Sequence, residues 1–128
     1  MMLIKSLIMA AATATAVIEL TEETWDHTIL DGEHNYNHQV GWFVKFYAPW
    51  CGHCQRLAPT WEQFAKQHSD LVNVAGVDCT KYGKLCGDYD VRGYPTLMYF
   101  PVGSSDHGIH FNGAREVDDF VKFVEDNQ

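Results

Sequence analysis

The run from Trp42 to Ala48 limits the fold of this chain more than any other segment, because Lys45 is its only charged residue. Such an apolar run is typical of a strand that is covered on both faces. Pro49 ends the strand, and a helix is expected to begin near Cys51. The apolar face of this helix would consist of Leu57, Trp61, Phe64 and Ala65, with Pro59 expected to kink it. The pattern predicts a central strand in a sheet that carries helices on both faces.

The other hydrophobic patterns complete a β-α-β-α-β-α-β-β-α order. Thr21 can cap a helix that runs to about Leu30, and residues 31–39 form a polar loop. The remaining predicted elements are a strand at Val17–Leu20, a strand at Leu71–Val77, a helix at Lys81–Tyr89, a hairpin of Thr96–Phe100 with Ile109–Phe111, and a last helix with Val117, Phe120, Val121 and Val124 on one face. This order predicts an α/β fold with a mixed central sheet.

Residues 1–16 are expected to be a secretory signal peptide rather than the first helix of the domain. Lys5 is the only charge before Glu19, an apolar run begins at Leu7, and Ala14 and Ala16 provide the small residues of a cleavage site. The apolar stretch is about half as long as a membrane-spanning helix requires. Residues 17–128 are then expected to form a single domain in a compartment where disulfides persist.

The charge balance excludes some classes of ligand. The chain has 9 basic and 17 acidic side chains and a net charge of −8, which argues against binding to nucleic acid or to an anionic membrane. Four histidines fall in predicted loops or turns and are expected to be solvated rather than to bind metal: His34, His38, His107 and His110.

The strongest chemical signal is Cys51-Gly52-His53-Cys54 at the predicted strand-to-helix junction. The free N–H groups and the dipole of a helix N-terminus favour a thiolate at Cys51, and a protonated His53 would add to this effect. Cys54, one turn further in, is expected to be more buried and to keep its proton. We therefore predict a redox-active pair. The alternatives are half of a zinc site completed by Cys79 and Cys86, a structural disulfide, and an inert thiol pair.

Three segments, in order, resemble the signature segments of a protein disulfide isomerase a-type domain, which has the thioredoxin fold. They are Phe46–Cys54 (FYAPWCGHC), Gly93–Leu97 (GYPTL) and Gly113–Asp119 (GAREVDD). The resemblance covers about residues 17–126. It implies a thiol–disulfide oxidoreductase or isomerase that forms and rearranges disulfides in folding secretory proteins. In this role Cys51 is the attacking nucleophile and Cys54 is the resolving thiol.

The resemblance also assigns roles outside the cysteine pair. Pro95 matches a cis-proline that faces the cysteines, and together with Trp50 and Tyr94 it would line a groove for the substrate peptide. Arg115 matches a mobile arginine that modulates the pKa of the resolving cysteine.

The expected partners are unfolded or misoxidised secretory polypeptides, with glutathione or an upstream oxidase as redox partner and with no cofactor or metal. The expected location is the lumen of the endoplasmic reticulum, although the chain ends at Gln128 without a Lys-Asp-Glu-Leu signal. Cys79 and Cys86 resemble a second, structural disulfide of some family members, with a regulatory thiol pair as the alternative. Two other functions stay open: a catalytic fragment or relative of a flavin-linked sulfhydryl oxidase, and a chaperone-like module that binds peptides without turnover.

Lys45 and Gly76 depart from the family pattern. The family normally has a buried carboxylate at the first position, which accepts the proton of the resolving cysteine, and a partner lysine at the second. A lysine in the interior is costly unless it is paired or neutral. Lys45 is therefore expected to reach the edge of the fold or to pair with an acid. Alternatively, it shuttles the proton as an amine or stabilises thiolates as a cation.

Overall fold

Five strands form one mixed sheet in the computed structural model, which describes residues 15–104 and 107–128. They are β1 (Ile18–Leu20), β2 (Trp42–Tyr47), β3 (Asn73–Asp78), β4 (Thr96–Phe100) and β5 (Ile109–Phe111), in the spatial order β1-β3-β2-β4-β5. β3 pairs in parallel with both β1 and β2, whereas the β2–β4 and β4–β5 pairs are antiparallel. The central place of β2 confirms the prediction from its apolar run.

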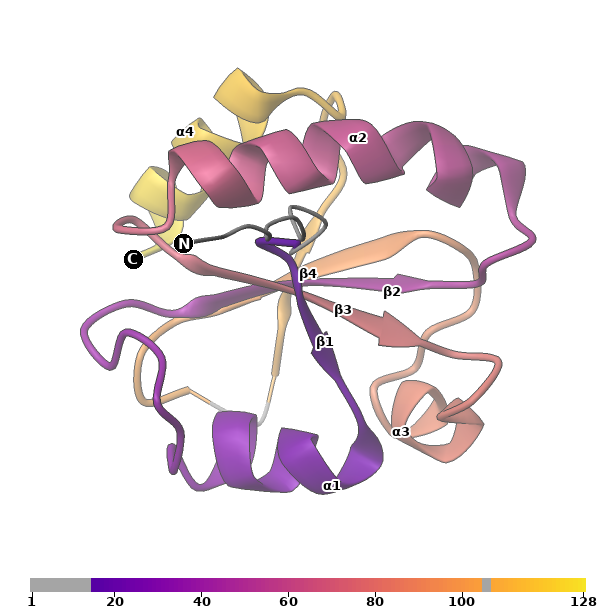
Figure 1. Ribbon diagram of the computed structural model, residues 1–128, viewed down its shortest axis with the longest axis horizontal. Coiled ribbons are helices and arrows are strands. Elements are labelled where there is room, and N and C mark those ends of the chain that lie inside the picture. The colour runs from indigo at the N-terminus through magenta and orange to yellow at the C-terminus, as the bar shows by residue number, and fades with distance from the viewer. Residues whose placement is uncertain (1–14, 105–106) are drawn as a thin grey trace, which may run out of the picture.

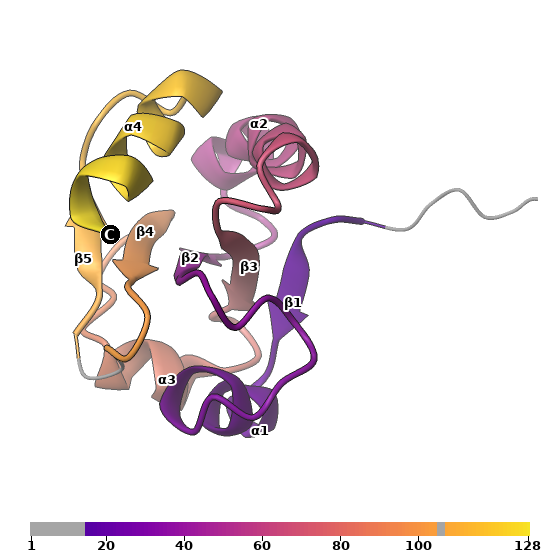
Figure 2. The same cartoon turned by 90° about the vertical axis from the view of Figure 1, so that its left-hand side faces the viewer.

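Helices cover both faces of the sheet, as predicted. They are α1 (Glu22–Trp25), which continues directly into the π-helix η1 (Asp26–Leu30), then α2 (Gly52–Gln67), α3 (Gly83–Asp88) and α4 (Val117–Asn127). In both views α2 and α4 lie on one side of the sheet and α1 and α3 on the other (Figures 1 and 2). This arrangement confirms the α/β thioredoxin fold.

Side chains of β2 alternate between two hydrophobic cores, because successive residues of a strand point to opposite faces. Val44 and Phe46 belong to the core under α1 and α3, whereas Phe43 packs with Leu57 and Trp61 of α2 in the other core. The alternation places Lys45 on the same face of the sheet as Phe43, which is the face that α2 covers.

The first helix begins as predicted but changes type. The Thr21 side chain accepts a hydrogen bond from the Thr24 N–H, which confirms Thr21 as the N-terminal cap. Beyond Trp25 each hydrogen bond spans five residues instead of four, which is the π-helical pattern. The Asp31 N–H, for example, donates to the Asp26 carbonyl at 3.0 Å. The predicted extent to Leu30 is therefore correct.

Several predicted boundaries differ by one or two residues, and at two predicted starts the reason is that local turns take the backbone hydrogen bonds. β3 begins at Asn73 rather than Leu71, since the N–H groups of Leu71 and Val72 donate to the His68 carbonyl instead of to the sheet. Likewise α3 begins at Gly83 rather than Lys81, since the Lys81 and Tyr82 N–H groups donate to the Asp78 carbonyl.

Helix α2 continues through Pro59 as one element, so the expected kink does not divide it. The expected signal peptide lies almost entirely outside the described residues, which begin at Thr15. Within the part of the chain that the structure describes, none of the helices has both the length and the apolar character required to cross a membrane.

Candidate active site

The cysteine pair lies at the junction of β2 and α2. Cys51 is the N-cap of α2, with an extended backbone (φ −78°, ψ 124°), and its carbonyl accepts the first helical hydrogen bond from the Gln55 N–H at 3.0 Å. The Cys51 N–H donates to the Ala48 carbonyl at 3.1 Å, and Gln55 Nε2 donates to the Pro49 carbonyl at 3.0 Å. These bonds fix the turn, so that Cys51 lies at the positive end of a 16-residue helix.

The loop before β4 lies against this turn. The Tyr94–Pro95 peptide bond is cis, and Cys51 Sγ donates to the Tyr94 carbonyl at 3.6 Å. Trp50 is 70% exposed, and its ring lies 6.0 Å from the Tyr94 ring in a T-shaped contact. The structure therefore places the carbonyl of the cis Tyr94–Pro95 peptide against Cys51 Sγ and the Trp50 ring against that of Tyr94.

The two cysteines have opposite electrostatic surroundings. A hydrogen bond from the Cys54 thiol is the main influence that lowers the pKa of Cys51, and the backbone N–H groups of Cys54 and His53 and the charge of Arg56 act in the same direction. Cys54 is 4% exposed, and burial raises its pKa to about 11. Cys51, which is partly exposed, thus ionises more readily than Cys54, which holds its proton more tightly.

Arg56 is a site residue that the sequence interpretation missed. Its guanidinium, which can only donate, bonds to His53 Nδ1 at 2.9 Å, so this nitrogen carries no proton in the arrangement observed. The positive side chain that lowers the pKa of Cys51 is therefore Arg56, whereas His53 contributes through its backbone N–H. The three-residue spacing on one helix was the available signal.

Lys45 is buried beneath α2 rather than at the edge of the fold, with an exposed fraction of 8%. Its Nζ lies 4.6 Å from the centroid of the Tyr47 ring, and the Tyr47 hydroxyl donates to Glu19 Oε1 at 2.7 Å. Glu19 is thus an acid close enough to influence Lys45, but it bonds to Tyr47 and forms no direct ion pair with Lys45. Neither Glu19 nor Tyr47 was predicted as a site residue.

Arg115 is not shown in contact with the cysteines. It is exposed and lines a shallow cavity that Pro95 and Thr96 also line. Among the residues for which side chains are described, it has no hydrogen-bond or ion-pair partner. Its role in adjusting the pKa of Cys54 stays a prediction.

The other two cysteines form a disulfide in the structure. The bond joins Cys79, just after β3, to Cys86 in α3, with 5.8 Å between the Cα atoms. Both side chains are buried in the core on the α1 and α3 face. In this state neither thiolate is available to complete a zinc site with Cys51 and Cys54.

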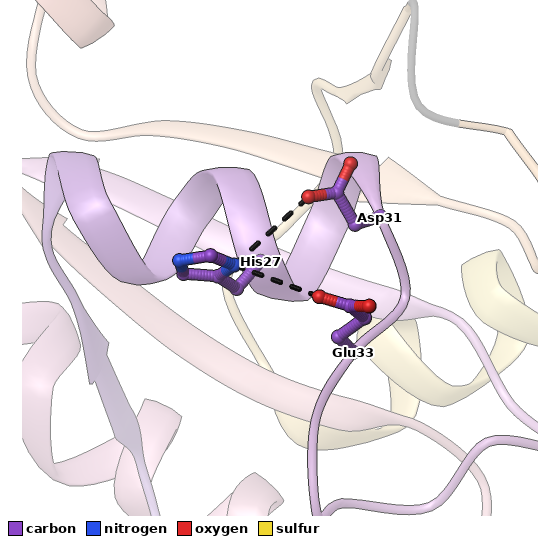
Figure 3. Close-up of side chains that lie close together, drawn as sticks. All are labelled: His27, Asp31 and Glu33. Carbon is purple, nitrogen blue, oxygen red and sulfur yellow. Dashed lines mark ion pairs between the residues drawn. The ribbon is translucent and has the colours of Figure 1, made fainter.

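The histidines of the predicted loops differ in their exposure to solvent. His107 and His110 are exposed, but His34 is half-buried and its ring stacks on that of His38 at 4.3 Å. In η1 and the loop after it, His27 Nδ1 lies 3.9 Å from an Asp31 oxygen and 3.8 Å from a Glu33 oxygen (Figure 3). All three of these side chains are exposed, so they form a surface ion-pair cluster when His27 is protonated.

Comparisons with known proteins agree with the geometry. The thioredoxin family model matches residues 16–126. The chain is 43% identical over 117 residues to the "Probable protein disulfide-isomerase A6" of Medicago sativa, a match that covers 89% of this chain and 30% of that protein. It is 40% identical over 111 residues to the "Thioredoxin domain-containing protein 5 homolog" of Drosophila melanogaster, covering 85% of this chain and 24% of that protein.

Solved structures of thioredoxin domains are also similar to this chain. The Trx4 domain of ERdj5 superposes with a TM-score of 0.75 at 28% identity, covering 88% of this chain and 96% of that one. The J-Trx1 fragment of ERdj5 has a TM-score of 0.73 at 33% identity, covering 87% of this chain and 49% of that one. The chain spans less than a third of the length of the curated relatives named above. With its CxxC pair at the start of α2 and Cys51 Sγ bonded to the carbonyl of a cis Tyr94–Pro95 peptide, this chain belongs to the thioredoxin family, as a domain of the protein disulfide isomerase a type.

Proposed function

We propose that this chain is a thiol–disulfide oxidoreductase that forms and rearranges disulfides in folding polypeptides of the secretory pathway. The observation that carries the proposal is the difference between the two cysteines of one motif. Cys51 is accessible and its pKa is lowered, whereas Cys54 is buried and its pKa is raised to about 11. Disulfide isomerases among the relatives support this chemistry.

The difference in acidity between Cys51 and Cys54 defines the order of the steps in thiol–disulfide exchange. The Cys51 thiolate attacks one sulfur of a substrate disulfide, so that a mixed disulfide forms and the other substrate sulfur leaves as a thiolate. Rearrangement occurs when that freed thiolate, or another thiolate of the substrate, attacks the mixed disulfide. Otherwise Cys54 loses its proton and attacks Cys51 Sγ, which releases the substrate in reduced form and leaves the Cys51–Cys54 disulfide.

Oxidation of a substrate is the reverse sequence. A substrate thiolate attacks Cys51 Sγ in the Cys51–Cys54 disulfide, and a second substrate thiolate then displaces Cys51. The two electrons remain on the dithiol until glutathione disulfide or an upstream oxidase accepts them. A helix N-terminus that stabilises the Cys51 thiolate favours the dithiol form and therefore makes the disulfide more oxidising.

The substrate is proposed to be an extended peptide that lies across Trp50, Tyr94 and Pro95. An aromatic side chain that is 70% exposed beside the nucleophile offers a large apolar contact without sequence preference. The secretory location is supported by the composition of residues 1–16 and by the Cys79–Cys86 disulfide, because disulfides persist in oxidising compartments.

Reactivation of ribonuclease with scrambled disulfides tests the proposal. We expect the protein to accelerate reactivation, Cys51→Ser to abolish the acceleration, and Cys54→Ser to accumulate protein–substrate mixed disulfides. A double Cys51→Ala and Cys54→Ala variant that still promotes recovery as well as the parent would contradict the proposal and favour peptide binding without turnover.

A further inference from the structure

A buried lysine lies on the sheet face beneath the cysteine helix, and the oxidoreductase mechanism above does not use it. Lys45 is one of four buried polar or charged residues in the described part of the chain. Replacing a buried charge with an apolar side chain is often neutral or stabilising, so a buried lysine needs an explanation other than stability.

The strand register brings Lys45 and Glu19 to one row across the sheet. Gly76 of β3 is the register partner of Glu19 on β1 and also of Lys45 on β2. Because all three occupy one row, the side chains of Glu19 and Lys45 lie on the same face of the sheet, with a glycine between them.

Because Gly76 has no side chain, the side chains of Glu19, Tyr47 and Lys45 occupy the space above it. A Cβ atom at position 76 would lie 2.7 Å from Glu19 Oε2, 3.2 Å from Tyr47 Cε1 and 3.3 Å from Lys45 Cε. Tyr47 contacts both charged side chains, with a cation–π contact from its ring to Lys45 and a hydrogen bond from its hydroxyl to Glu19. Among the described residues, no hydrogen bond or ion pair within 4 Å neutralises Lys45 Nζ, so its charge can act on neighbouring groups.

We propose that Lys45 is a positioning residue for the resolving step, in which its ammonium, over the Tyr47 ring on the sheet face beneath α2, stabilises the Cys54 thiolate. This inference rests on the proposed function. In the step itself, the Cys54 thiol gives its proton to solvent and its thiolate attacks Cys51 Sγ. The Cys51–Cys54 bond forms as the mixed disulfide breaks, and the substrate thiolate leaves.

The charges around Lys45 agree with this role. Burial lowers the pKa of Lys45, while Glu19 of β1 and Cys54 and Glu62 of α2 oppose that shift. Tyr47 is the other titratable group in contact with it, and the neighbours on β3 and β4, Gly76 and Leu97, carry no charge. Lys45 in turn lowers the pKa of Cys54, against the larger effect of burial, but it is not among the influences on Cys51.

The test compares the parent with Lys45→Met, which removes the charge and keeps the length of the side chain. A ¹³C NMR titration of labelled cysteine, recorded in a Cys51→Ser background, reports the pKa of Cys54 directly. We expect Lys45→Met to raise this pKa by about one unit, which is a tenfold smaller thiolate fraction. The matched control is Lys81→Met, which removes an exposed cation and should leave the titration unchanged.

The kinetic consequence is measured with Cys51 present, by quenching the reaction with a disulfide peptide and counting mixed disulfides. A less acidic thiol gives a more nucleophilic thiolate, so a tenfold loss of thiolate slows resolution by only about threefold. The mixed disulfide should therefore live about three times longer in Lys45→Met, while alkylation of Cys51 by iodoacetamide keeps its parent rate. Lys45→Gln, which also removes the charge, is the second variant if Lys45→Met does not fold.

An unchanged Cys54 titration in a folded variant at position 45 would overturn the inference. The titration requires no turnover, so the two proposals fail separately. A protein that does not reactivate ribonuclease but shows the Cys54 shift would contradict the proposed function alone. Normal reactivation with an unshifted Cys54 would contradict only the role of Lys45.

Discussion

Individual side chains near the cysteine pair set the pKa of Cys51, and Arg56 is one of them. Its guanidinium holds His53 Nδ1 at 2.9 Å and helps to lower the pKa of Cys51. We predict that Arg56→Met slows alkylation of Cys51 by up to about fivefold below its titration midpoint, the range expected for an exposed charge interaction. The control is Lys122→Met, an exposed cation of α4. Equal pH profiles for Arg56→Met and the parent would remove Arg56 from the site.

The sequence predicted the residues that act through a local motif and missed those that act through tertiary register. Cys51 and Cys54 follow from a C-x-x-C at a strand-to-helix junction. Glu19 is separated from Lys45 by 26 positions, and only the pairing of both strands with β3 brings them together. No local periodicity carries that information.

Among the helices and strands, the order along the chain, the central place of β2 and the helices on both faces were predictable, because hydrophobic periodicity reports which faces are buried. The first residue of β3 could not be predicted, because Leu71 and Val72 are as apolar as the strand that follows. Their N–H groups nevertheless bond to the His68 carbonyl at the end of α2. Apolar character identifies buried residues and does not show where the sheet hydrogen bonds begin.

The Cys79–Cys86 disulfide links the residue after β3 to α3 and should stabilise the folded state. For a sequence separation of 7 residues, the loss of unfolded-state entropy is worth about 2–3 kcal/mol. We predict that the Cys79→Ala and Cys86→Ala double variant loses about this much free energy of unfolding in urea, with an unchanged alkylation rate at Cys51. An equal stability would show that the bond does not constrain the fold.

At the scale of the whole molecule, the buried Cys54 thiol makes the stability of the dithiol form sensitive to alkali. The folded state holds this proton more tightly than the unfolded state, since burial raises the pKa from 9.0 to about 11. The contribution of the Cys54 thiol to the unfolding free energy is therefore complete below about pH 9 and is lost as the pH rises through about 11. The Cys51–Cys54 disulfide form has no such proton to lose.

We predict that the dithiol form loses up to about 2–3 kcal/mol of unfolding free energy relative to the disulfide form between pH 9 and 11. Urea unfolding of the two forms in parallel cancels the titration of tyrosines and lysines that both share. A difference between the forms that stays constant over this range would show that Cys54 is not held as a buried thiol.

Cys51 and Cys54 differ in acidity because Cys51 caps a helix in partial contact with solvent, whereas Cys54 is buried. Alkylation with iodoacetamide from pH 4 to 11, followed at each cysteine by mass spectrometry of its peptide, measures this most directly. The predicted result is a Cys51 midpoint below the value of about 8.5 for free cysteine, with Cys54 unmodified until the pH approaches 11. A Cys51 midpoint at or above that of free cysteine would contradict the account.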